Sequence, residues 1–160
     1  MNHLNQPPHR ATEPVVRPIE LLTGSLLAKD LAKSRRFYED MLGLECVTCG
    51  PGRLLARAPK APMEGDRPWV LEVRQSDAIS NLQRVLHHWG IDLVSKAAVD
   101  QMHRRLKEHQ AEYEIGAIHD PQFQHSSYAF YFCDLDSNWW EFEFLPPGRI
   151  DKIYEQGDVL

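Results

Sequence analysis

The sequence is poor in several features that mark common classes of protein. It has 3 cysteines among 160 residues, a small and odd number for a disulfide scaffold, so we expect reduced thiols. The 18 lysines and arginines against 23 aspartates and glutamates give a net charge of −5, which argues against a nucleic-acid-binding protein. No apolar run approaches the roughly 20 residues that cross a bilayer. We therefore predict no nucleic-acid partner and no membrane partner.

The N-terminal segment also lacks the apolar stretch of a secretory signal. Its prolines at positions 7, 8, 14 and 18 and its few apolar residues predict a flexible tail over residues 1–18. With few cysteines and no such signal, we expect a cytoplasmic protein. The sequence contains no Gly-rich phosphate loop and no G-x-S-x-G turn, so nucleotide binding and acyl hydrolysis have no support.

The first half of the chain predicts a strand, a helix and three further strands. Residues 19–28 are apolar and short, which is typical of a strand. Asp30 stands where a helix N-cap is expected, before residues 31–42, and Gly43 suits the end of that helix. Three short strands are predicted to follow, at 44–48, 53–57 and 69–73.

The second half repeats this order. A strand is predicted at 88–93, and Ser95 is placed to cap a helix over residues 96–110. Further strands are predicted at 112–118, 128–133 and 139–145. Residues on equivalent sides of the two halves match at identical offsets: Thr23, Leu26, Asp30 and Phe37 align with His88, Ile91, Ser95 and Met102. Because a repeat this short cannot close a core alone, we expect the halves to pack together.

Three stretches of the sequence resemble one known superfamily. GSLLAKDLAKSRRFYEDMLGLECV is similar to the first βα unit of the vicinal oxygen chelate superfamily, which includes glyoxalases, bleomycin-resistance proteins and extradiol dioxygenases. HHWGIDLVSKAAVDQMHRRL resembles the opening of its second module, and HSSYAFYFCDLDSNWWEFEFL resembles its closing strands. The resemblance covers residues 19–146, and the closing stretch is most similar to single-domain, dioxygenase-like members.

This resemblance implies an α+β fold of two βαβββ modules paired into a curved-sheet cleft. Module 1 would cover about residues 19–74 and module 2 about residues 86–146, with a C-terminal tail over 147–160. In the superfamily the cleft holds a divalent metal, whose ligands come from alternate, inward-facing positions on separate strands. The resemblance also implies a homodimer.

Carried over residue by residue, the superfamily's metal ligands fall on His88, Glu141 and Thr23. His88 takes the histidine position of the second module, and Glu141 takes the glutamate position. Thr23 stands where the first module usually has a histidine, and a neutral hydroxyl is a poor ligand. Iron(II) bound by two histidines and one carboxylate keeps open positions for substrate and oxygen, and this sequence lacks one of those histidines on the family pattern.

Four interpretations of Thr23 remain open. Another side chain supplies the missing ligand, with His87, His125 and Glu143 as candidates. Alternatively, a weakly held metal needs the substrate to complete its coordination. In the third interpretation the cleft binds an apolar ligand without metal. In the fourth the domain is a degenerate partner of another subunit.

Each candidate residue also has an ordinary structural interpretation. A lone histidine in a strand is often structural, and the acids of the segment WWEFEF could face water on a half-exposed strand. His119, next to an aspartate and a proline, is expected in a turn. Cys46 and Cys49 form a single C-x-x-C, which we interpret as free thiols because no second pair accompanies it.

The leading hypothesis is a metal-dependent, extradiol-type dioxygenase that cleaves a small aromatic or vicinal-diol substrate with O2. Fe(II) is the expected metal, with another divalent ion or none as alternatives. The resemblance gives His125 the role of catalytic base and Tyr128 that of orienting substrate. Two other functions stay open: a metal-free binding protein of the bleomycin-resistance type, and a glyoxalase-type lyase or isomerase. Thr23 and Val70 count against the latter, although Glu72 is a nearby acid.

Overall fold

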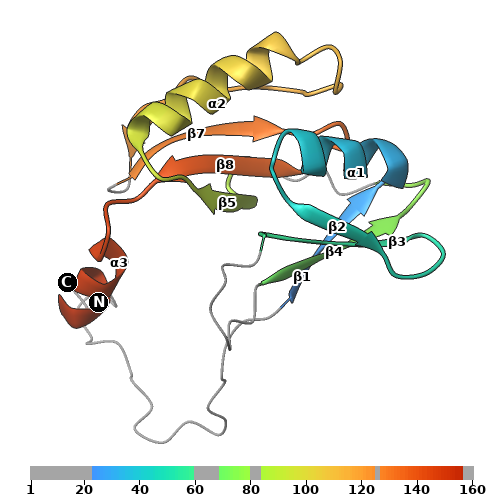
Figure 1. Ribbon diagram of the computed structural model, residues 1–160, viewed down its shortest axis with the longest axis horizontal. Helices are drawn as coiled ribbons and strands as arrows, with labels where there is room; N and C mark the ends of the chain where they lie inside the picture. The colour runs from blue at the N-terminus through green and yellow to red at the C-terminus, as the bar shows by residue number, and fades with distance from the viewer. Residues whose placement is uncertain (1–22, 60–68, 80–83, 125–126, 157–160) are drawn as a thin grey trace, which may run out of the picture. The chain divides into compact units, whose positions relative to one another are not determined.

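The computed structural model describes residues 23–59, 69–79, 84–124 and 127–156. They form two β-α-β-β-β modules and a C-terminal helix, so the predicted two-module α+β fold is confirmed (Figure 1). In chain order the elements are β1 (Thr23–Ala28), α1 (Leu31–Asp40), β2 (Glu45–Thr48), β3 (Arg53–Arg57), β4 (Val70–Gln75), β5 (His88–Asp92), α2 (Lys96–Glu108), β6 (Gln122–Gln124), β7 (Ser127–Cys133), β8 (Trp139–Phe144) and α3 (Arg149–Gln156). Strands β1 to β8 belong to one compact unit and α3 to another.

Both long helices begin at the predicted caps. The Asp30 carboxylate accepts hydrogen bonds from the backbone N–H groups of Ala32 and Lys33, at 3.0 and 3.1 Å. Gly43 follows the end of α1 with a φ of 68°, a left-handed conformation that glycine adopts without strain. Ser95 accepts from the N–H of Ala98 at 3.2 Å and caps α2. Such caps satisfy N–H groups that a first helical turn leaves without partners.

Each module forms one four-stranded sheet, with strand orders β1-β4-β3-β2 and β5-β8-β7-β6. In the first sheet Thr23 pairs with Val70 across the parallel strands β1 and β4. In the second, His88 pairs with Trp139 across β5 and β8. Thr23 and His88 therefore open equivalent strands, as the alignment of the two halves predicts. The described helices include none that is long and apolar enough to cross a membrane.

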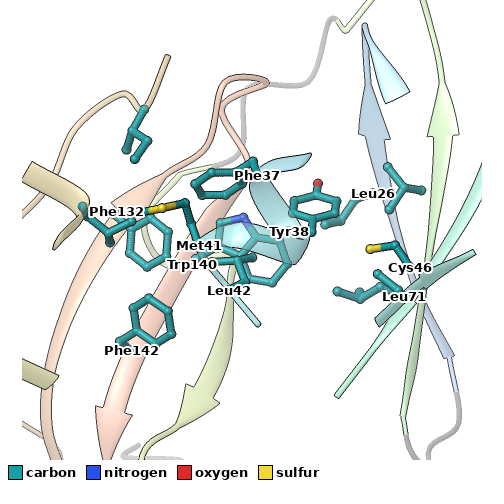
Figure 2. Close-up of a cluster of buried hydrophobic side chains, with 14 of the residues drawn as sticks. Leu26, Phe37, Tyr38, Met41, Leu42, Cys46, Leu71, Phe132, Trp140 and Phe142 are labelled. Carbon is teal, nitrogen blue, oxygen red and sulfur yellow. The ribbon is translucent and has the colours of Figure 1, made fainter. Parts of the chain in front are cut away.

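The two modules share one apolar core, which α1 fills between the sheets. Figure 2 shows Phe37 and Tyr38 of α1, with Met41 and Leu42 just after it, between side chains from the two sheets: Leu26, Cys46 and Leu71 on one side, and Phe132, Trp140 and Phe142 on the other. The rings of Tyr38 and Trp140 lie 5.5 Å apart. We call the face that each sheet turns to this core its inner face and the opposite face its outer face.

A buried carboxylate in the β7–β8 turn also joins the modules. Asp134 is 2% exposed and accepts hydrogen bonds from Tyr38 Oη and Trp140 Nε1, both at 3.2 Å, and from Asn138. Burial raises the pKa of Asp134. Tyr38 belongs to α1 and Trp140 to β8, so this one side chain connects module 1 to module 2.

The strand predicted at 112–118 is wrong. Its first residues form turns after α2, and the N–H of Ile115 bonds back to the carbonyl of Gln110 at 2.9 Å. Only its end lies beside β7, where Gly116 donates to the carbonyl of Cys133 at 2.9 Å. Ile118 makes one isolated bridge with β7, and the edge strand of the sheet is β6. The apolar residues that suggested a strand are placed by the turn instead: Ile115 is 5% exposed and belongs to the core.

Candidate metal centre

The parallel strands β5 and β8 bring His88 and Glu141 together on the outer face of the second sheet. His88 Nε2 lies 3.1 Å from Glu141 Oε2. Their side chains are 24% and 9% exposed, so both are largely shielded from solvent. The two ligand positions expected from the resemblance are therefore in contact, although 53 residues separate them in the sequence, from 88 to 141.

The backbone orients the His88 ring. Its Nδ1 lies 2.6 Å from the carbonyl oxygen of Val85, which can only accept, so Nδ1 carries a proton. A neutral ring then has its lone pair on Nε2, and this lone pair faces the Glu141 carboxylate. Two electron-rich atoms at 3.1 Å repel unless a proton or a cation lies between them. The same arrangement, with Nδ1–H on a carbonyl and Nε2 free, is usual for histidines that bind metals.

Other groups on the same face surround the Glu141 carboxylate. Gln124 Nε2 donates to Glu141 Oε1 at 3.5 Å, which leaves Oε2 toward the imidazole. Tyr131 pairs with Glu141 across β7 and β8, and its ring lies 4.7 Å from that of His88. Burial, reinforced by the charge of Glu141, raises the pKa of Tyr131 to about 12. Tyr131 therefore keeps its proton at neutral pH and can donate a hydrogen bond there.

Glu143 lies two residues along β8 from Glu141, on the same face. Burial and the neighbouring charge of Glu141 raise the pKa of Glu143. Gly90 makes room for it, because a Cβ at that position would lie 3.0 Å from Glu143 Oε1. Within the described part of the chain, no group of three or more His, Cys, Asp or Glu side chains is arranged to hold one metal ion. The described residues thus offer His88 and Glu141 as a pair of ligands.

Thr23 does not join this pair. A Cβ on Gly24 would lie 2.7 Å from the ring of Trp89, so these two positions face each other across the inner side of the sheets. Because successive strand residues point to opposite faces, Thr23 and His88 point outward from their sheets, away from each other. Thr23 is exposed at the start of β1.

The structure also places the remaining candidates. Tyr128 lies on the inner face of β7, where its hydroxyl donates to Asp100 Oδ1 of α2 at 2.7 Å, so it is not beside Glu141. His87 precedes β5 and is exposed. His125 lies outside the described residues.

Two residues that sequence reasoning did not select stand on the outer face with the pair. Tyr131 is one, and the β7–β8 hairpin register would have identified it as the partner of Glu141. His119 is the other: its N–H donates to the carbonyl of Tyr131 at 2.8 Å, and its ring lies 6.3 Å from that of Tyr131 and 5.3 Å from that of Trp139. Nothing in the sequence around His119 indicated this pairing with β7.

Module 1 has a carboxylate at the position equivalent to Glu141. Glu72 pairs with Ser25 across β4 and β1, as Glu141 pairs with Gly90 across β8 and β5. Arg53 and Arg74 bond its two oxygens, at 2.6 and 3.1 Å. The hydrogen bonds from Arg74 and Arg53 lower the pKa of Glu72. This carboxylate is already neutralised by two guanidinium groups, so it is a poor ligand for a cation.

The sequence model of the Glyoxalase/Bleomycin resistance protein/Dioxygenase superfamily matches residues 19–142, most of the chain. The chain belongs to this superfamily. The resemblance seen in the three sequence stretches is therefore confirmed at the level of the superfamily. No curated protein matches the sequence.

Solved structures of the same superfamily share the fold. A possible glyoxalase from Bacillus cereus is 22% identical, with a TM-score of 0.59 over 78% of this chain and 98% of its own. Lactoylglutathione lyase from Agrobacterium tumefaciens is 23% identical, with a TM-score of 0.54 over 79% and 94%. A mutant of the fosfomycin resistance protein FosX from Listeria monocytogenes, complexed with Mn(II) and dihydroxypropylphosphonic acid, is 15% identical, with a TM-score of 0.58 over 84% and 96%. The superfamily thus includes proteins that bind divalent metals and small molecules.

Proposed function

We propose that this superfamily member is a metal-dependent, dioxygenase-like enzyme that acts on a small aromatic or vicinal-diol substrate with O2. The contact between His88 and Glu141 supports the metal. With Nδ1 bonded to Val85, the 3.1 Å approach of Nε2 to a carboxylate oxygen calls for a proton or a cation between them, and in this proposal a divalent ion takes that place. Fe(II) is the metal that suits this chemistry, and Mn(II) or Zn(II) would compete for the same donors.

His88 Nε2 and the Glu141 carboxylate would hold the ion. When bound, Fe(II) supplies Lewis acidity toward two neighbouring substrate oxygens and a route for electrons to O2. Because the described residues contribute these two ligands, several coordination positions remain for substrate and water. Gln124 steadies the carboxylate through Oε1, and Val85 steadies the imidazole through Nδ1.

Tyr131 and His119 are the proposed proton-handling groups of this site. Tyr131, protonated at neutral pH, donates a hydrogen bond to a substrate oxygen beside Glu141. An imidazole nitrogen of His119, whose ring lies 6.3 Å from that of Tyr131, accepts the proton of a phenolic substrate. Tyr131 thereby takes the orienting role that the resemblance suggested for Tyr128, whose hydroxyl is bonded to Asp100.

A homodimer is part of the proposal. The outer face of the first sheet carries exposed apolar side chains, including Leu27 and Val47 at 37% and 58%. A second copy whose first sheet covers the His88 face would bury these residues and bring its Thr23 near the metal. That arrangement supplies the hydroxyl from another subunit, since Thr23 and His88 of one chain point away from each other.

Metal analysis tests the proposal. We expect protein purified without chelator and then supplied with Fe(II), Mn(II) or Zn(II) to retain about one ion per chain, and His88→Ala and Glu141→Gln to retain almost none. His87→Ala is the matched control, because it removes the adjacent, exposed imidazole. If the wild type retains no more metal than His88→Ala, the metal site is excluded and a metal-free binding protein remains. If metal binds and catechols cause no O2 uptake, the dioxygenase step alone is excluded.

A further inference from the structure

A cavity of about 300 Å³ lies on the inner side of the two sheets, away from the His88–Glu141 pair. Its walls come from both modules and include Ala56, Leu71 and Trp69 of the first and Trp89, Ile91 and Trp140 of the second. Trp89 follows His88 in β5, and Trp140 precedes Glu141 in β8. Because neighbouring strand residues point to opposite faces, the backbones of β5 and β8 separate the cavity from the candidate metal centre.

Indole rings give the cavity flat, apolar walls in fixed positions. The rings of Trp69 and Trp89 lie 4.7 Å apart at an angle of 43°. Both rings press against β1 at Gly24, where an added Cβ would lie 2.6 and 2.7 Å from them. Trp140 donates its Nε1 to Asp134, so it offers the cavity no free polar atom. Surfaces of this kind favour an aromatic ligand that can stack or make edge contacts with them.

Two charged residues border the cavity within the described part of the chain, and neither offers it a free charge. Arg57 follows the inward-facing Ala56 in β3, so its side chain lies on the outer face, where it bonds Glu45 Oε2 through Nε at 3.0 Å and Nη2 at 2.9 Å. Asp92 follows the inward-facing Ile91 in β5, and its carboxylate accepts from the N–H of Leu145 at 3.1 Å. The lining therefore favours an uncharged ligand.

We propose that this cavity is a second binding site, which takes an uncharged planar aromatic molecule. The rings of the ligand contact Trp69 and Trp89. Size agrees with this class, because sites for small organic molecules begin at about 300 Å³. The inference does not depend on the proposed metal chemistry, since the two sites lie on opposite faces of the second sheet.

Two related dyes test the site. 1-Anilinonaphthalene-8-sulfonate carries an acidic group, and N-phenyl-1-naphthylamine has the same rings without it. We expect the neutral dye to bind the wild type at one per chain, with fluorescence excited through the tryptophans, and the sulfonate dye to bind at least about tenfold more weakly, because the described lining offers its charge no partner. Arg57→Gln should leave the affinity for the neutral dye unchanged, because the guanidinium lies on the outer face. Ala56→Leu, which places three further carbons in the cavity, should weaken both dyes at least about tenfold.

The controls separate this site from the outer face. Ser25→Leu adds similar bulk on the outer side of β1, and His88→Ala removes the candidate metal ligand; both should bind the dyes as the wild type does. Circular dichroism and thermal melting verify the fold of each variant. Dye affinity that survives Ala56→Leu, or that falls with His88→Ala, would overturn the proposed position. If Ala56→Leu does not fold, the partly exposed Trp69→Ala still decides, because an unchanged affinity for the neutral dye would overturn the contact with this ring. A sulfonate dye that binds as tightly as the neutral one would overturn the selection for an uncharged ligand.

Discussion

The two modules share one backbone topology, and a comparison of one pair of equivalent positions shows how their side chains differ. β1 and β4 carry Thr23 and Glu72, whereas β5 and β8 carry His88 and Glu141 in the same register. In the first module two arginines neutralise the carboxylate. In the second the carboxylate faces an imidazole oriented by a backbone carbonyl. On the same backbone, the first module thus holds a carboxylate that is already paired with two cations. The second holds a carboxylate and an imidazole that face each other.

This difference shows that the fold does not decide where a metal binds. Strand pleating places both glutamates on outer faces, beside the first residues of the adjacent parallel strands. Whether a cation is attracted depends on the groups already bonded to each carboxylate. The metal site proposed for this chain therefore lies in module 2, where an imidazole faces the carboxylate.

The largest expected effect comes from cutting the connection between the modules. Asp134→Ala would leave the buried Tyr38 hydroxyl and Trp140 indole N–H without an acceptor, so we expect the free energy of unfolding to fall by about 3 kcal/mol. Urea denaturation measures it. Asp120→Ala, which removes a carboxylate that is 85% exposed, should change stability by less than about 0.5 kcal/mol. Equal effects would mean that Asp134 does not couple the two halves.

Replacing each of the two equivalent glutamates by glutamine, in two separate variants, tests the comparison directly. We expect Glu141→Gln to weaken metal binding by about 100-fold, because it removes a charged ligand. Glu72→Gln should leave the affinity within about twofold, because Arg53 and Arg74 already occupy that carboxylate. Titration calorimetry with Mn(II) measures both. A loss of affinity in Glu72→Gln that matches Glu141→Gln would place the site in module 1.

Restoring a histidine in module 1 sharpens the comparison. Thr23→His should raise metal affinity about tenfold without adding a second ion per chain, because the new imidazole would act at the His88–Glu141 site of a second copy. Ser25→His, two residues further along the same face of β1, is the control and should have no effect. The affinity and the number of ions per chain come from the same calorimetric titration. A second ion per chain in Thr23→His would show instead that Glu72 can be released from its arginines.

The smallest effect concerns a thiol of module 1. Burial raises the pKa of Cys46 to about 11 from an ordinary value near 9. The folded state therefore holds this proton more tightly than the unfolded chain, so the stability it contributes is complete below pH 9 and is lost as the pH rises toward 11. Between pH 8 and pH 10.5 the wild type should lose slightly more stability than Cys46→Ala. A parallel decline in the two proteins would contradict the shift.

Local signals in the sequence predicted most of the fold. Asp30, Gly43 and Ser95 cap helices through contacts within a few residues, so their patterns can be recognised without tertiary structure. The strand prediction over 112–118 failed because Ile115 packs into the core from a turn. Two apolar residues three apart are compatible with either a turn or a strand. The turn is held by the bond from the N–H of Ile115 to the carbonyl of Gln110, just after α2, and no local sequence pattern predicts this bond.

The proposed ligand pair could be selected from the sequence, and its surroundings less so. The alignment of the two halves and the superfamily resemblance selected His88 and Glu141, which the structure places in contact. Alternation along β7 places Tyr128 and Tyr131 on opposite faces. Because both faces carry aromatic residues, the sequence does not show which face is the inner one. The contact of Tyr128 with α2 resolves this, and it is a long-range property. The position of His119 likewise depends on pairing between segments that the sequence does not link.

The carbonyl that orients His88 belongs to Val85, in the connection that leads from the first module into the second. The acceptor for Nδ1 is thus a backbone atom that lies outside both sheets. A change in the backbone at Val85 would therefore turn the imidazole relative to the Glu141 carboxylate while His88 and Glu141 themselves stayed unchanged. The direction of this ring can be altered from outside the two sheets.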